Sequence, residues 1–232
     1  MDTKRFIDFY SDCFFYFYNM FENFTIQLIE AFKQPLPGKS GQVQLKPYLK
    51  INKNIDAPSF IKPKEGAVMA VIYPKENIPH LLLIERPQYD GVHSGQIAFP
   101  GGKIEKSDAS FLHAALRETH EEVGIESNHI QVVGNLTEVF VFASNFMVYP
   151  FVGIMQEIPR LALETKEVAG VLEIPLSRFF EDGIIKEKKI QNALGFNLMA
   201  PYYDLDNKVL WGATAMMVSE LCAVIKQHQI IL

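Results

Sequence analysis

Three glutamates, Glu118, Glu121 and Glu122, lie within five residues near the end of a predicted helix. The helix is predicted from apolar and small residues that recur every three or four positions: Leu112, Ala115, Leu116, Thr119 and Val123. At about 100° per residue, the glutamates share a face away from that stripe. A helix C-terminus disfavours negative charge, and neighbouring carboxylates raise one another's pKa. The cluster therefore requires a positively charged partner.

The predicted helix spans Ala109 to Val123. Ser107 or Asp108 is expected as its N-cap, because both side chains can accept a hydrogen bond from a free backbone N–H. Gly124 is expected to end it, since glycine readily adopts the left-handed conformation of a C-terminal cap.

A divalent cation would neutralise the acidic cluster. The alternative is a solvated acidic face, but such a face usually intersperses lysines among the acids. Oxygen-only ligands indicate a hard ion, Mg²⁺ or Mn²⁺, rather than Zn²⁺. Arg117 lies one turn before Glu121 and can therefore pair with and orient its carboxylate. We interpret the glutamates as the core of a magnesium or manganese site.

The residues around the cluster resemble the Nudix hydrolase signature, which joins an upstream Gly and Glu to Arg-Glu-apolar-x-Glu-Glu-x-Gly-apolar. The second half matches from Arg117 to Ile125, with Thr119 at the usually apolar position. In the first half, Asp108 replaces Glu, and eight residues rather than seven separate it from Arg117. This lengthened form resembles the coenzyme A pyrophosphatase branch of the superfamily.

A second motif of that branch, Leu-Leu-x-x-Arg followed by a spaced Gly and Phe-Pro-Gly-Gly, matches upstream. The chain reads LLIER at residues 82–86 and HSGQIAFPGG at residues 93–102. Ile84 replaces the usual Thr, Gly91 the usual Arg, and Gln96 a common Glu. The missing Arg at Gly91 removes a natural phosphate contact, so it bears on the substrate rather than on the chemistry.

The resemblance implies roles for individual residues. Arg117 would orient Glu121, and Glu121 is the first choice for the general base. Glu164 or Glu167, in the loop before Val171, is the alternative base. The implied metal ligands are Gly102, through its carbonyl, and Glu118, Glu121 and Glu122. The implied substrate contacts are Arg86, His93, Gly95, Gly101 and Lys103.

The resemblance also implies a reaction, the metal-dependent hydrolysis of coenzyme A or its derivatives to 3′,5′-ADP and 4′-phosphopantetheine. One alternative keeps the reaction and changes the substrate to another nucleoside diphosphate derivative, such as ADP-ribose or a dinucleotide. Another is a non-catalytic Nudix ligand sensor. Sensors usually lose part of the Arg-Glu-x-x-Glu-Glu set, whereas this chain keeps all of it.

The composition limits the classes of partner that the protein is expected to bind. A net charge of −5 and a pI near 5.7 give no electrostatic footprint for nucleic acid or an anionic membrane, so a small-molecule substrate is expected. Cys13 and Cys222 are too few for a disulfide framework, which makes a reducing cytoplasm the expected location.

We expect an α/β fold, and the resemblance specifies a Nudix-type α/β/α sandwich around a mixed sheet, with an extra N-terminal helix. Residues 1–34 are predicted as an aromatic-rich helix, 35–65 as a linker and 66–232 as the Nudix domain. The aromatic helix offers a surface for homodimerisation. Strands are predicted at 66–73, 80–85, 97–99, 130–142, 148–155 and 171–174, and a final helix at 213–226.

Overall fold

The computed structural model describes residues 20–48, 62–91, 93–191 and 197–232. The helices are α2 (Met20–Phe32), α3 (Lys39–Gln42), α4 (Phe111–Val123) and α5 (Gly212–Gln227), with short 3-10 helices η1 (Val43–Leu45), η2 (Ser127–His129) and η3 (Leu176–Phe180). The main sheet contains β1 (Lys64–Lys75), β2 (Ile78–Glu85), β3 (Ile97–Ala98), β4 (Gly101–Lys103), β5 (Gln131–Asn135), β6 (Val139–Val141), β7 (Phe146–Ile154) and β8 (Gly170–Pro175). A second sheet contains β9 (Ile185–Gln191), β10 (Asn197–Leu205) and β11 (Lys208–Trp211).

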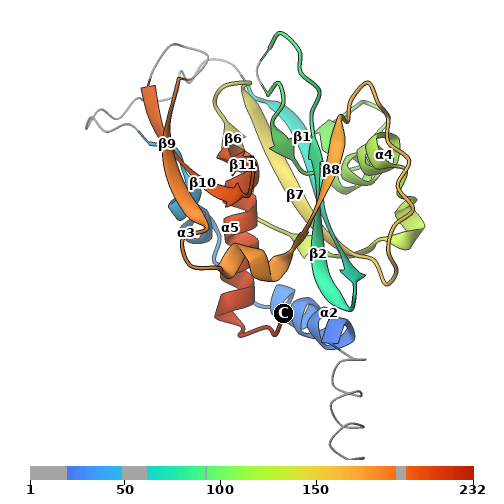
Figure 1. Cartoon of the computed structure of the whole chain (residues 1–232). Coiled ribbons are helices and arrows are strands. Elements are labelled where there is room, and N and C mark those ends of the chain that lie inside the picture. The colour runs from blue at the N-terminus through green and yellow to red at the C-terminus, as the bar shows by residue number, and fades with distance from the viewer. Residues whose placement is uncertain (1–19, 49–61, 92, 192–196) are drawn as a thin grey trace, which may run out of the picture.

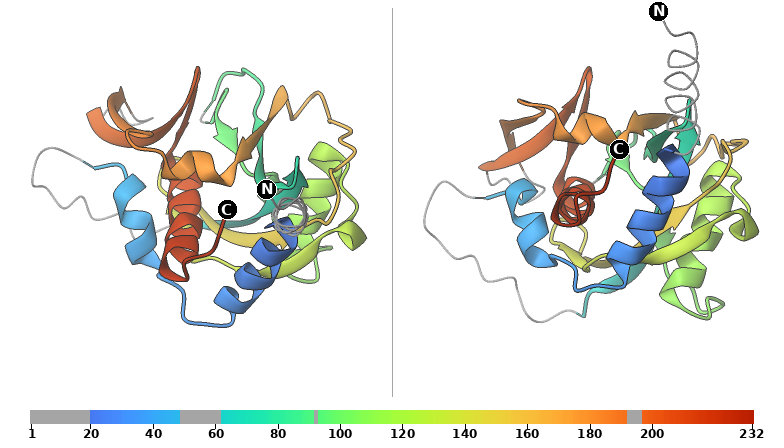
Figure 2. Two further views of the ribbon diagram at one scale, coloured as in Figure 1. Left: turned by 60° about the horizontal axis from the view of Figure 1, so that its bottom comes forward. Right: turned by 90° about the horizontal axis from the view of Figure 1, so that it is seen from below.

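The main sheet is mixed and lies between two helical layers, as Figures 1 and 2 show. Its strand order is β3–β2–β1–β7–β5, and β1 runs parallel to β7 while the other pairs are antiparallel. Successive side chains of β1 point to opposite faces. Ala67, Met69 and Val71 pack in the core on the α4 side, whereas Ala70 and Ile72 pack in the core that includes α5. The predicted α/β/α sandwich is confirmed.

The strands around β1 diverge at one end of the sheet. The first half of β1 pairs with β4 through residues 66–68, and its last residues pair with β2 through residues 72–75. The far half of β2 then pairs with β3 and β8. This divergence brings Gly101 and Gly102 of β4 beside the C-terminal half of α4.

The N-terminal helix is present as α2, whose residues Phe21, Phe24 and Leu28 are buried in the same core as α5. Residues 1–19 of the predicted aromatic helix lie outside the described part of the chain. In the segment predicted as a linker, α3 and η1 pack against α5, and Leu45 is fully buried. No helix among the described residues is long and apolar enough to span a bilayer.

Two local predictions were wrong, and one sheet was missed. The N-cap of α4 is Ser110, whose Oγ accepts the backbone N–H of His113 at 3.1 Å. The predicted strand at 130–142 is interrupted and forms β5 and β6 as separate strands. The second sheet was not predicted: β9 is rich in lysine and β11 has only four residues. Gly124 ends α4 as expected, with a φ of 76°.

Candidate active site

The three glutamates of α4 occupy different environments rather than one shared solvent face. The side chain of Glu121 is 54% exposed, that of Glu118 is 14% exposed and that of Glu122 is 1% exposed. Glu122 lies on the buried side of α4 with Thr119 and Val123. The expectation that all three share a face away from the core was therefore wrong, because Glu122 is adjacent to the apolar stripe and turns toward β4.

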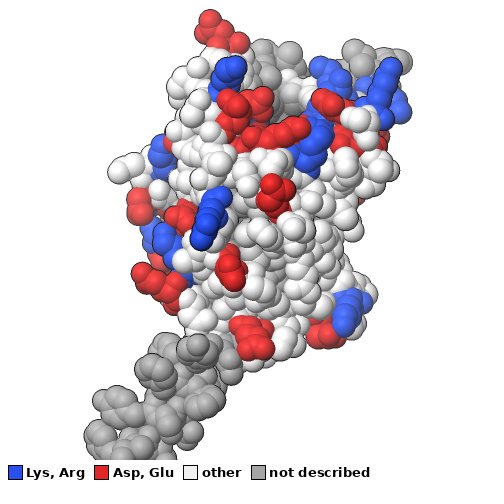
Figure 3. Space-filling view, turned by 90° about the vertical axis from the view of Figure 1, so that its right-hand side faces the viewer, with Lys and Arg blue, Asp and Glu red and all other residues white. Residues whose placement is uncertain are grey.

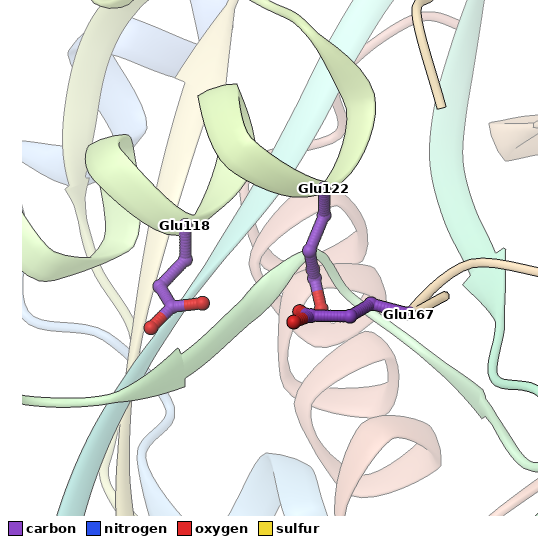
Figure 4. A group of neighbouring side chains, drawn as sticks. All are labelled: Glu118, Glu122 and Glu167. Carbon is purple, nitrogen blue, oxygen red and sulfur yellow. The ribbon is translucent and has the colours of Figure 1, made fainter. Parts of the chain in front are cut away.

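Glu118 and Glu122 form an acidic cluster with Glu167, which comes from the loop before β8. One carboxylate oxygen from each of the three lies within 4.8 Å of the others. Figure 4 shows Glu118 and Glu122 extending from α4 toward β4, while Glu167 approaches from the loop. Three carboxylates at this separation form a candidate site for a hard divalent cation.

Backbone hydrogen bonds fix the loop of Glu167 to the end of α4. The N–H of Ala162 donates to the carbonyl of Val123 at 2.9 Å, and the N–H of Glu164 donates to the carbonyl of Glu122 at 3.0 Å. The N–H of Glu167 donates to the carbonyl of Glu164 at 2.9 Å. The loop is therefore positioned by the helix that carries the other two acids.

Two glycines of β4 allow the carboxylates to approach the sheet. The N–H of Gly101 donates to Oε2 of Glu122 at 2.8 Å. A Cβ atom on Gly102 would lie 2.5 Å from the carboxyl carbon of Glu118, closer than any real contact. Gly101 has a φ of 150°, which disfavours other residues. Gly102 thus leaves room for the carboxylate of Glu118, whereas a Cβ atom on Gly101 would lie 2.4 Å from the backbone carbonyl oxygen of Ala67 on β1.

Arg117 connects the acidic side chains around the cluster. Its Nε and Nη2 donate to the two oxygens of Asp108 at 3.0 and 2.9 Å. Its Nη1 donates to Glu118 at 3.0 Å and to Glu121 at 2.8 Å, and its Nη2 donates to the carbonyl of Lys103 at 3.3 Å. Arg117 orients Glu118 and Glu121 in this structure, so the predicted pairing with Glu121 is present.

Asp108 was not among the predicted site residues, although it lies at the lengthened spacing. Its side chain is fully buried and also accepts the N–H of Glu105 and contacts Nδ1 of His113. The bidentate bond from Arg117 holds the pKa of Asp108 well below its usual range, and Asp108 in turn raises the pKa of Arg117. The sequence signal was available, because Asp108 stands at the Glu position of the signature that also contains Arg117.

Burial shapes the electrostatics of the two helical acids. Desolvation raises the pKa of Glu122 to about 7, although the Gly101 N–H and the Arg86 guanidinium act in the opposite direction. Desolvation also raises the pKa of Glu118, and Arg117 opposes that shift. Each rise in pKa reflects the free-energy cost of holding a charged carboxylate away from water. A bound cation would stabilise the charged forms of both.

Of the predicted substrate contacts, Arg86 directly follows β2 and lies beside this cluster. Nη1 of Arg86 lies 3.9 Å from Oε1 of Glu122, and its Nε is buried without a hydrogen-bond partner in the described part of the chain. His93, with a φ of 74°, contacts Oε1 of Gln96 through Nδ1 at 2.9 Å. Gly95 has a φ of 63°, a backbone conformation that favours glycine.

Two predicted acids stay apart from the cluster. The carboxylate of Glu121 accepts Nη1 of Arg117 and is not one of the three grouped acids. The carboxylate of Glu164 accepts the N–H of Lys166 at 3.1 Å.

On the side of the molecule to the right in Figure 1, where α4 lies, acidic side chains gather in a band bordered by lysines and arginines (Figure 3).

Comparison with known proteins agrees with this architecture. The NUDIX domain profile matches residues 63–188, which is more than half of the 232-residue chain. The chain belongs to the Nudix superfamily. Nudix hydrolases generally use divalent metals, and the acidic cluster fits that requirement. Membership of the Nudix superfamily supports the hydrolysis of a small-molecule nucleotide substrate by this protein.

Two curated relatives of this Nudix protein carry the name "Uncharacterized Nudix hydrolase NudL". The Enterobacter sp. (strain 638) protein is 35% identical over 159 residues, covering 68% of this chain and 81% of the relative. The Citrobacter koseri protein is 37% identical over 144 residues, covering 62% of this chain and 73% of the relative. Among solved structures, the M. smegmatis Nudix hydrolase RenU aligns with a TM-score of 0.49 at 15% identity, covering 75% of this chain and 91% of that one.

Proposed function

We propose that this Nudix hydrolase cleaves the pyrophosphate bond of coenzyme A or its derivatives, giving 3′,5′-ADP and 4′-phosphopantetheine. The observation that carries the proposal is the contact between the two sequence motifs. The coenzyme A-type element at residues 93–102 supplies Gly101 and Gly102, which lie directly against Glu122 and Glu118. Gly102 also opens the Nudix signature, so the coenzyme A-type element runs directly into the acidic cluster.

The residues present fit a divalent cation. Glu118 and Glu122 would hold it with the carbonyl of Gly102, and Glu122 has only the Gly101 N–H as a hydrogen-bond donor among the described residues. Such an ion supplies charge neutralisation of the pyrophosphate and lowers the pKa of attacking water. Mg²⁺ or Mn²⁺ suits an all-oxygen ligand set.

We assign Glu167 as the general base rather than Glu121. Glu167 is exposed to solvent and lies beside Glu118 and Glu122, whereas Glu121 is engaged by Arg117. Glu167 would accept the proton of the water that attacks phosphorus, as the bridging P–O bond breaks. Arg86 would donate to a phosphate oxygen through the guanidinium that lies near Glu122.

The test is an assay of the purified protein with Mg²⁺ or Mn²⁺ and, separately, coenzyme A, ADP-ribose and nucleoside triphosphates, with chromatographic resolution of the products. Release of 3′,5′-ADP from coenzyme A supports the proposal. Turnover of ADP-ribose alone would replace coenzyme A with that substrate. Tight nucleotide binding without turnover would indicate a ligand sensor.

Matched variants identify the site. Glu122→Gln removes a proposed ligand, and Glu167→Gln removes the proposed base while leaving Glu118 and Glu122 in place. Glu126→Gln changes an exposed acid three residues after α4 and serves as the control. Loss of turnover in the first two variants and its retention in the third would link the reaction to the acidic cluster.

A further inference from the structure

Two lysines and an aromatic ring share one face of the main sheet. Lys103 of β4 lies opposite Gly66 of β1, and Lys64 of β1 lies opposite Phe146 of β7. Residues at paired positions point to the same face, and so do residues two apart on one strand. Lys64, Lys103 and Phe146 therefore lie on one face, with the two lysines as diagonal neighbours whose Cα atoms are roughly 7 to 8 Å apart.

This face is the opposite of the one that α4 covers. Gly102 lies opposite Ala67, which packs on the α4 side, and Gly102 contacts Glu118 there. Lys103 is the next residue and so points the other way. The two lysines and the acidic cluster are thus separated by the thickness of β4 at the same end of the sheet.

The positive charge of the two lysines is not neutralised within the described residues. Neither Lys64 nor Lys103 forms an ion pair with a carboxylate there, whereas Lys186 and Lys208 each lie 2.5 Å from one. Nζ of Lys64 lies 5.7 Å from the centroid of the Phe146 ring instead. In a chain of net charge −5, two neighbouring unpaired cations form a local site of attraction for an anion.

Close packing places the Phe146 ring beside the lysines. A Cβ atom on Gly66 would lie 3.3 Å from Cδ1 of Phe146 and 2.6 Å from the carbonyl oxygen of Gly102. The ring therefore extends over Gly66, and the strand between the two lysines presents no side chain.

We propose that Lys64 and Lys103, with the Phe146 ring holding Lys64, bind a phosphate of the substrate that is not part of the cleaved pyrophosphate. This inference rests on the proposed function, and in coenzyme A that group is the 3′-phosphate of the ADP half. The substrate would pass the edge of β4, with its pyrophosphate at the acidic cluster and its third phosphate on the opposite face. Lys64 and Lys103 then determine specificity for nucleotides that carry the extra phosphate.

The test compares coenzyme A with dephospho-coenzyme A, which lacks only the 3′-phosphate, in steady-state assays of the wild type, Lys64→Met and Lys103→Met. Each variant is expected to lower kcat/KM for coenzyme A about tenfold, mainly through KM, since a charged hydrogen bond to phosphate is lost. For dephospho-coenzyme A the change should stay within about twofold. Lys106→Met, an exposed lysine of the following turn, is the control that should alter neither.

Each outcome decides the proposal. Lys64→Arg should restore discrimination, because it keeps the charge, and thermal melting verifies that the variants fold. An equal loss with both substrates, or no loss with either, overturns the inference. A wild type that hydrolyses both substrates with the same kcat/KM also overturns it but leaves the proposed function standing. A wild type that hydrolyses neither defeats the proposed function and this inference together.

Discussion

Glu122 and Glu220 are both helical glutamates buried in the protein, but their surroundings differ. Glu220 of α5, with no exposed surface, accepts hydrogen bonds from Nε2 of Gln42 at 2.7 Å and from Oγ1 of Thr137 at 2.8 Å. The N–H of Thr137 also donates to it, at 3.2 Å. Among the described residues, Glu122 of α4 accepts one hydrogen bond, from Gly101, and its nearest cation is Arg86 at 3.9 Å.

The difference separates a structural acid from a candidate ligand. A buried carboxylate is stable when several donors satisfy it, and Glu220 meets that condition by connecting α5 to α3 and to the segment between β5 and β6. Glu122 has unused acceptor capacity and faces Glu118 and Glu167. Unsatisfied buried charge of this kind is typical of functional sites.

The largest effect is expected from Glu122→Gln on catalysis. Removing a proposed metal ligand should lower kcat by about a thousandfold or more, since charge neutralisation carries most of phosphoryl transfer. The thermal midpoint of the metal-free protein should fall little, because the amide can still accept the Gly101 N–H. Initial rates and melting curves measure both. A variant that keeps its rate would remove Glu122 from the metal site.

Glu220→Ala should have the opposite effect, a loss of stability without a loss of catalytic rate. It leaves the donors of Gln42 and Thr137 unsatisfied in the core, and we expect a loss of about 3 kcal/mol in the free energy of unfolding. The kcat of the folded protein should be unchanged. Urea unfolding with parallel rate measurements checks this. A rate loss at undiminished stability would mean that Glu220 affects the active site.

Metal binding should stabilise the protein through Glu122 but not through Glu220. At a Mg²⁺ concentration of about 100 times Kd, the stability gain should be about 2.7 kcal/mol. Glu122→Gln should lose most of this gain, whereas Glu220→Ala should keep it from a lower starting point. Melting curves with Mg²⁺ and after chelation measure the gain. Equal gains in both variants would contradict the contrast between the two acids.

Glu173 provides a smaller, pH-dependent comparison. Hydrogen bonds from Lys75 and Tyr73, at 2.8 and 2.5 Å, lower its pKa below the usual value. Such a group stabilises the fold above its unfolded-state pKa, and the contribution is lost as pH falls through the lowered folded-state pKa. Glu173→Gln should therefore cost about 1 kcal/mol at neutral pH and almost nothing in strong acid. Denaturant unfolding across pH values measures this, and a pH-independent cost would refute it.

The sequence predicted the elements whose signals are local. The periodicity of α4, the Gly124 stop and the Arg117 to Glu121 pairing depend on neighbours within a turn, and all are present. The position of the N-cap was missed because the side chain of Asp108 is engaged by Arg117 and the N–H of Glu105. Ser110 caps the helix in its place.

Features that depend on distant contacts were harder to predict. Helical spacing alone cannot show that β4 covers one side of α4, so Glu122 was assigned to the face away from the apolar stripe. The loop acids Glu164 and Glu167 were equivalent in sequence, and only the bonds of that loop to α4 bring Glu167 to the cluster. The lysine-rich β9 hides its strand pattern, because both of its faces carry polar residues.

The hydrogen bonds from Ala162 and Glu164 to the last carbonyls of α4 bear on which insertions and deletions the protein can tolerate. Those carbonyls have no hydrogen-bond partner inside the helix, so the loop satisfies them. In return, the helix end fixes the position of Glu167 relative to Glu118 and Glu122. On its far side the same loop is tied to β2, where the N–H of Ala169 donates to the carbonyl of Glu85 at 2.8 Å. Insertions and deletions in the turns among β5, β6 and β7 should therefore be tolerated without displacing the proposed base from the acids it serves.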